Sequence, residues 1–201
     1  MQLGSSDNAI ACEAAEQLRD KGWVEDGSLR SVHLQDANLE KVNLAQADLS
    51  FANFQRANLV GASLQGAVLI GADLSFANLD NANLTDVDLS NSFLQETSFY
   101  ETNLSNSKLK FAFLVKADMG KVQLENANLQ KSDLEGANLT EANLVHSDFR
   151  GANLQDAVLI NSNLHGANLE NCNLMNSKVT INQLEKVKSL EGAIMPDGAL
   201  V

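Results

Sequence analysis

The side chains that could carry chemistry in this sequence are three histidines and two cysteines. Imidazole titrates near neutral pH and binds metals, so His33, His146 and His165 are the candidates for acid–base catalysis or metal ligation. None of them has a Ser or Cys nucleophile and an orienting carboxylate at a spacing typical of a catalytic triad. Cys12 and Cys172 stand at opposite ends of the chain, which favours two reduced, buried thiols over a disulfide.

The motifs of cofactor chemistry are also missing from the sequence. It contains no G-x-G-x-x-G loop, no phosphate-binding loop and no C-x-x-C pair. We therefore predict that the protein is not an enzyme and that it binds no cofactor.

The sequence instead has a period of five. From Leu29 to Leu174 every fifth residue is Leu, Phe or Met, through thirty consecutive positions. We name this large apolar position i. Position i-2 is always small or β-branched, as at Ala37, Val42 and Cys172. Each repeat therefore offers two residues for burial.

Neither a helix nor a straight strand buries both positions. Five residues turn through about 500° of an α-helix, so successive large residues would spread around the whole cylinder. Five is odd, so on a continuous strand they would alternate between the two faces. The pattern fits a chain that is extended for about three residues, points i-2 and i inward, and turns one corner per repeat. Right-angled corners close such a path after about 20 residues, and the coils stack about 4.8 Å apart.

The motif Ala-Asp/Asn-Leu at residues 37–39, 47–49 and 137–139 resembles the pentapeptide-repeat family of cyanobacterial type. The resemblance covers residues 29–176 and implies a right-handed quadrilateral β-helix. We predict an all-β solenoid of about seven to eight 20-residue coils, with short α-helical caps at the N- and C-termini.

The predicted chain has three parts: an N-terminal helical cap (1–28), the pentapeptide-repeat β-helix (29–179), and a C-terminal helical cap with its tail (180–201). In the first part, Ser6 or Asp7 caps a helix of about residues 8–21. The residues predicted to close the open end of the core are Ile10, Ala14, Leu18, Trp23 and Val24.

In the last part, Thr180 and Gln183 form a predicted capping box for a helix of about residues 181–190. The apolar residues here either cap the last coil or contact a second subunit, so a monomer and a C-terminally mediated homodimer both stay open. These residues are Leu184, Val187, Leu190, Ile194 and Met195.

Position i-1 points outward and is usually Asn or Asp. Five asparagines spaced 20 or 40 residues apart fall in one column, which we interpret as an amide ladder between coils: Asn43, Asn83, Asn103, Asn143 and Asn163. His146 and His165 would lie on neighbouring coils, but two imidazoles without further ligands do not make a metal site, and we predict none.

Phenylalanine replaces the usual polar residue at Phe93 and Phe113, which are 20 residues apart and should stack. Phe111 and Val115 flank them, so we predict a contiguous apolar patch. Such a patch marks a partner site, or else an aromatic ladder that stabilises the coils. A band of basic residues lies nearby: Lys108, Lys110, Lys116, Lys121 and Lys131.

Charge and composition restrict the partners. The formal net charge of -12, from 26 acidic and 14 basic residues, repels nucleic acid and anionic lipid, so we expect an unidentified protein partner. The sequence shows no secretory signal and no apolar run of about 18 residues, so we expect a cytoplasmic protein.

Three functions follow as hypotheses. The first is a non-enzymatic, rigid scaffold for protein–protein interaction or regulation. The other two are implied by the resemblance, since some members of the family mimic DNA and bind a type II topoisomerase (gyrase), and others regulate bacterial cell differentiation.

Overall fold

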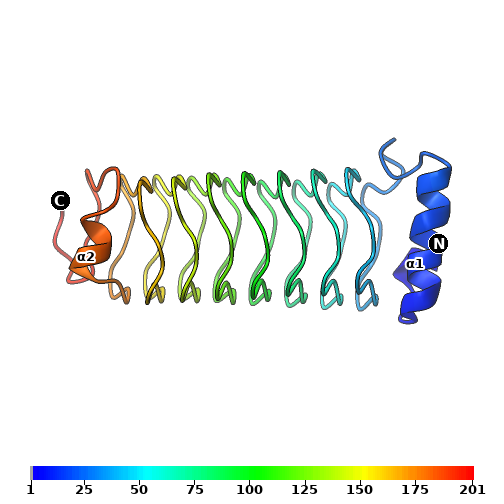
Figure 1. Ribbon diagram of the computed structural model, residues 1–201, viewed down its shortest axis with the longest axis horizontal. Coiled ribbons are helices and arrows are strands. Elements are labelled where there is room, and N and C mark those ends of the chain that lie inside the picture. Colours follow the sequence, from blue (N-terminus) through cyan, green and yellow to red (C-terminus); the bar gives the residue numbers. More distant parts are fainter. Residues whose placement is uncertain (1) are drawn as a thin grey trace.

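The computed structural model describes residues 2–201 as a straight rod of stacked coils, with a helix at each end (Figure 1). The helical elements are the 3-10 helix η1 (Gln2–Gly4), α1 (Asn8–Asp20) and α2 (Ile181–Leu184). Between α1 and α2 the chain forms the right-handed quadrilateral β-helix that the family resemblance implies. Met1, part of the predicted N-terminal cap, lies outside the described residues.

Each side of a coil is so short that it pairs through a single residue, at position i-1. Parallel bridges join residues 20 apart, as from His33 to Asn53 to Asp73. Around each bridge, backbone hydrogen bonds run both ways: Leu34 N donates to Asn53 O (2.7 Å), and Asn53 N donates to Val32 O (2.9 Å). Backbone pairing between coils therefore repeats on all four sides of the rod.

The interior holds the two residues per repeat that the sequence assigns to it. Leu39 and Ala37, at positions i and i-2, are fully buried, and the same holds along the rod. Three phenylalanines, Phe54, Phe99 and Phe149, replace leucine in this core. Burial of a Leu-sized side chain contributes about 1.5–3 kcal/mol, so the stacked columns are the main apolar contribution to folding.

The corners depend on a left-handed backbone. Every fifth residue from Ser31 to Asn176, at position i+2, has a positive φ near 60°. The turn is closed by a bond such as Ala37 N to Leu34 O (3.2 Å). Left-handed φ is costly for β-branched residues, and none of these positions holds Val, Ile or Thr.

A corner glycine also makes room for the coil before it. A Cβ atom on Gly71 would lie 2.8 Å from the ring of Phe51, which extends over that corner. At this corner the side chain at position i+2 extends over the next coil, and Gly71 leaves room for it.

The N-terminal cap begins as predicted, with Asp7 accepting a hydrogen bond from Ala9 N (3.0 Å) and capping α1. Two predictions about its buried face are wrong, because Ile10 is 38% exposed and Trp23 is 46% exposed. The face of α1 against the coil is instead the stripe Ala11, Ala14, Ala15 and Leu18, spaced i, i+3, i+4 and i+7. Val24 is buried as predicted.

The predicted helix over 181–190 is wrong in length, since α2 ends at Leu184. Its capping box of Thr180 and Gln183 is present. Beyond Leu184 the chain rejoins the solenoid: Gly166 N donates to Lys186 O (2.9 Å), and Lys188 N donates to Ala167 O (2.7 Å). Hydrogen bonds to the last coil replace those of a longer helix.

The apolar residues of this segment contact the end of the core. Leu184 is buried, and Val187, Leu190 and Met195 pack against the cluster of buried residues. Ile194 forms a parallel bridge with Asn173, 21 residues away, and an antiparallel bridge with Leu200. A homodimer formed through this end of the rod stays a prediction.

The left-handed corners predict a clear rank of substitutions at Asn81, an exposed corner residue with φ of 60°. Asn81→Val should lower the free energy of unfolding by about 1–2 kcal/mol, because a β-branched residue is strained there. Asn81→Gly is the matched control and should stay close to the wild type. Urea unfolding followed by circular dichroism measures both; equal stability of the Val variant would show that corner strain does not limit the fold.

Candidate functional site

One face of the rod gathers the exposed phenylalanines. We name this side of the rod the Phe face. Its central column of bridged residues contains Asp73, Phe93, Phe113 and Asp133. Three of the eight phenylalanines are in the core. The other five are exposed, and all lie on the Phe face or at its two edges: Phe51, Phe76, Phe93, Phe111 and Phe113. Phe93 and Phe113 lie in the column, whereas Phe51, Phe76 and Phe111 lie at corners that the face shares with its neighbours.

The rings of Phe93 and Phe113 stack as predicted. Their centroids are 5.3 Å apart and their planes differ by 7°. They are 43% and 42% exposed. Phe111 is exposed at the preceding edge, and Val115 is half-buried beside Phe113. These four residues, predicted from the sequence as one patch, form what we name the aromatic patch.

The usual Asn or Asp at position i-1 has a local function. Its side-chain oxygen accepts a hydrogen bond from the backbone N–H two residues later, as Asn103 Oδ1 does from Ser105 N (3.0 Å). This side-chain turn fixes the start of the corner.

The predicted amide ladder in the Asn43 column is therefore wrong. The column exists, but its side-chain oxygens accept hydrogen bonds within the local turns. The backbone N–H groups that donate to them are those of Ala45, Thr85, Ser105, Val145 and His165. Side-chain bonds between coils occur on other faces, as from Asn58 Nδ2 to Asn38 Oδ1 (3.1 Å).

Phenylalanine at position i-1 removes this turn. In the same column, Asp73 Oδ1 accepts from Ser75 N (3.0 Å), and Asp133 Oδ1 accepts from Glu135 N (3.2 Å). At Phe93 and Phe113 no such acceptor exists, so within residues 2–201 the N–H groups of Gln95 and Val115 have no hydrogen-bond partner. The aromatic patch thus has two backbone donors beside it.

Basic residues with no ion-pair partner lie at the edges of the Phe face. Between residues 29 and 176, six of the nine Lys and Arg side chains pair with carboxylates within 4.0 Å. In that described part of the chain the three that do not are Lys110, Lys116 and Lys131. The ammonium of Lys131 lies 5.7 Å from the ring centroid of Phe111.

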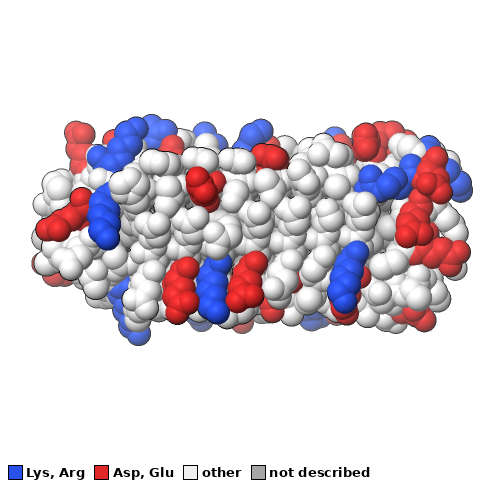
Figure 2. All heavy atoms as spheres, viewed as in Figure 1, with Lys and Arg blue, Asp and Glu red and all other residues white. Residues whose placement is uncertain are grey.

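Charges are unevenly spread over the rod. Figure 2 shows one long face that is nearly free of charged side chains, with acidic and basic residues gathered along its edges and at the two ends. A net charge of -12 therefore does not make a uniformly acidic surface.

The histidines and cysteines form no reactive cluster. The rings of His146 and His165 meet edge to face, with centroids 5.8 Å apart. Within residues 2–201 no group of three or more His, Cys, Asp or Glu side chains could hold a metal ion. Burial raises the pKa of the Cys172 thiol to about 12, so it stays protonated at neutral pH. In that same range no helix is long and apolar enough to cross a membrane.

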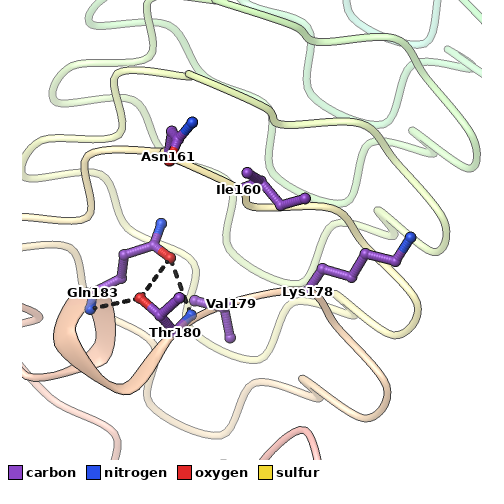
Figure 3. A pocket seen from close by; sticks show the side chains of 6 residues that line it. All are labelled: Ile160, Asn161, Lys178, Val179, Thr180 and Gln183. Atoms are coloured by element: carbon purple, nitrogen blue, oxygen red, sulfur yellow. Dashed lines mark hydrogen bonds between the residues drawn. The ribbon is translucent and has the colours of Figure 1, made fainter.

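A pocket of about 350 Å³ lies where the last coil meets α2 (Figure 3). Ile160 and Val179 supply its apolar wall, and Lys178 lies at its rim. Gln183 Nε2 donates to Leu159 O (2.7 Å) and Ser162 O (2.9 Å). The polar groups of Gln183 thus join the cap to the last coil and are not left free for a ligand.

Sequence reasoning missed two members of the Phe face. Phe51 and Phe76 occupy corners at position i+2, away from the stacked pair at position i-1 that marks the patch in the sequence. The sequence spacing does indicate that they belong together. Phe51 and Phe111 are 60 residues apart, which is three coils of 20 residues, so they lie at the same edge of the rod.

Whether the stacked rings serve stability can be tested with asparagine, the residue that the same column has at Asn53 and Asn153. Phe93→Asn with Phe113→Asn removes a stack worth about 0.5–1.5 kcal/mol and restores two side-chain turns worth about 1 kcal/mol each. We expect the free energy of unfolding to be unchanged or slightly higher. Asn103→Ala, which loses a turn, should be less stable by about 1 kcal/mol and checks the sensitivity of the urea measurement.

A drop of more than about 2 kcal/mol in the double asparagine variant would contradict this expectation. The rings would then be a stabilising ladder and not a surface kept for another purpose.

Comparison with known proteins gives one family. Pentapeptide repeats match in 8 copies that cover the segments 28–66, 47–86, 82–120, 117–156 and 152–180. No curated protein matches the chain in sequence.

Solved structures of the same kind are similar. HetL, a pentapeptide repeat protein involved in heterocyst differentiation regulation in the cyanobacterium Nostoc sp. strain PCC 7120, is 26% identical over 92% of this chain and 98% of its own, with a TM-score of 0.55. Rfr23 from the cyanobacterium Cyanothece 51142 is 42% identical over 50% of this chain and 62% of its own, with a TM-score of 0.33. Full-length QnrB1, a plasmid-mediated fluoroquinolone resistance protein, is 17% identical over 84% of this chain and 93% of its own, with a TM-score of 0.39. With the repeat matched from residue 28 to residue 180, the chain belongs to the pentapeptide repeat family.

Proposed function

We propose that this protein is a non-enzymatic, rigid scaffold that binds a partner protein through the aromatic patch of Phe93, Phe111, Phe113 and Val115. The observation that carries the proposal is the placement of all five exposed phenylalanines on the Phe face or its edges. Aromatic residues are enriched in the centres of protein interfaces, where they contribute most of the binding energy.

The patch suits a binding role because it is already ordered. Phe93 and Phe113 project from backbone that is bonded to the preceding coil, since Phe93 N donates to Ala72 O (2.9 Å) and Phe113 N donates to Ser92 O (3.0 Å). The next residues bond to the following coil, as Leu114 N does to Asp133 O (2.6 Å). A partner would bury stacked rings without first ordering the chain, which lowers the entropic cost of association.

A regulatory role is supported by the similarity to HetL, which is involved in heterocyst differentiation regulation. A rod without a convergent catalytic cluster could act on a pathway only through what it binds. We include in the proposal a cytoplasmic location and the absence of direct nucleic-acid or membrane binding, as the charge favours.

DNA mimicry toward gyrase has less support. It rests on the net charge of -12, while one long face carries few charges (Figure 2). The Phe face also has unpaired lysines at its edges. A mimic of the phosphate backbone needs closely and regularly spaced negative charge. The charge pattern favours the protein scaffold.

The proposal is tested by comparing baits in cell extract. Wild-type protein should retain a defined protein that the Phe93→Asn/Phe113→Asn variant loses, as quantified by mass spectrometry. The matched control is Val68→Asn/Val158→Asn, which replaces two apolar residues at position i-1 on other faces and should keep that protein. Equal capture by all three baits would remove the aromatic patch as the interface. Purified gyrase captured equally by all three would instead favour the acidic surface.

A further inference from the structure

The edge that precedes the Phe face is the most basic part of the solenoid surface. Three successive coils contribute to it: the first carries Lys110 and Phe111, the second Lys131, and the third Arg150. We name it the basic edge. Its residues at positions i+1 and i+2 from Ser90 to Gly151 include no acidic residue, and the next coil places Glu170 near Arg150. In a protein with a net charge of -12, this concentration of positive charge is a local reversal.

The basic side chains of this edge differ in whether they already have an ion-pair partner. Arg150 is engaged by Asp148, with Nη2 2.7 Å from Oδ2. Lys110 and Lys131 have no carboxylate within ion-pair distance among residues 2–201. Lys116, on the far edge of the Phe face, has Glu96 and Glu135 on the adjoining coils, so we do not count it here.

The basic edge is also hollowed. A shallow pocket of about 270 Å³ is lined by Gln130, Lys131, Arg150, Gly151 and Asn171. The glycine at this corner leaves space for the Lys131 stem, whose Cγ lies 3.4 Å from where a Cβ of Gly151 would be. A carboxylate in this pocket would lie beside the Lys131 ammonium and the amides of Gln130 and Asn171, while the Arg150 guanidinium stays paired with Asp148.

The aromatic patch adjoins this edge and adds donors of its own. Phe111 belongs to both, since Lys131 covers its ring and Phe113 follows it by two residues. The free N–H groups of Gln95 and Val115 lie beyond the stacked rings. Across the Phe face the order is therefore unpaired cations, aromatic rings and free backbone donors. These groups offer apolar contact and hydrogen-bond donors. The two carboxylates of the same column, Asp73 and Asp133, flank the rings and are engaged by hydrogen bonds from Ser75 N and Gln55 Nε2, and from Glu135 N and Asn153 Nδ2.

From this arrangement we infer that the partner presents an acidic peptide segment that also carries aromatic or large apolar side chains. Its apolar side chains pack on Phe93 and Phe113, and its carboxylates lie against Lys110, Lys131 and the pocket beside Arg150. The inference rests on the proposed function and adds the chemistry of the partner. It is argued from charge complementarity between an acidic segment and the only unpaired cations along this edge of the described solenoid.

The test uses the full chain and a fluorescein-labelled synthetic peptide in which Glu alternates with Phe. Fluorescence anisotropy should show saturable binding that weakens with added salt. Lys110→Gln/Lys131→Gln should weaken binding about tenfold and flatten the salt dependence. Lys186→Gln/Lys188→Gln, an equal change of charge on two exposed lysines of the C-terminal segment, should bind like the wild type.

Two further probes separate the apolar from the charged contribution. A peptide with Ala in place of Phe should bind about tenfold more weakly, and so should the original peptide to Phe93→Asn/Phe113→Asn. A peptide with Lys in place of Glu should not bind. Equal binding of the Glu and Lys peptides, or equal losses in the two lysine variants, would overturn the inference.

Other occupants give distinct results. Self-association of the wild type that Lys110→Gln/Lys131→Gln abolishes in sedimentation would assign the edge to a second copy and overturn the acidic-segment inference. A DNA oligonucleotide that displaces the peptide at similar concentration would point to phosphate and overturn it too. If a partner from cell extract depends on Phe93 and Phe113 while no acidic peptide binds, the scaffold function stands and this partner chemistry is wrong.

Discussion

The positive φ at every fifth residue is the constraint on which the rest of the structure depends. Each side of a coil is a single bridge wide, so no strand is long enough to hold its own direction. The left-handed corner sets that direction, and hydrogen bonds to the adjoining coils then hold it in place. Each group of five residues therefore carries two restrictions: β-branched residues are excluded from the corner, and a large apolar residue is required inside.

Outward-facing residues of this fold can be replaced with little loss of stability. Position i-1 contributes one side-chain turn to stability, and losing it at Phe93 or Phe113 leaves the bridge between coils intact. Ring stacking compensates for part of that loss. An apolar, donor-rich face can therefore be present on an acidic rod without any distortion of the core, which explains how one fold serves proteins with different partners.

The core was predictable from sequence because it obeys a strict period. Leu39 and Ala37 are buried, and Phe93 stacks on Phe113, as the spacing requires. The cap at Asp7 also follows from local chemistry. The early end of α2 at Leu184 does not, because helix propensity competes there with hydrogen bonds to Gly166 and Ala167, which only the assembled coil supplies. The gathering of Phe51 with Phe111 needed the corners to be counted as surface as well as the sides.

Because residues 20 apart are bridged, the number of residues between two side chains determines which face of the rod each of them lies on. Gain or loss of one pentapeptide between Phe51 and Phe113 would rotate every later coil by a quarter turn and send the later phenylalanines to a neighbouring face. Insertion of a whole coil would leave every later side chain on the same face and would only lengthen the rod. Natural variation in this stretch should therefore occur in steps of four repeats.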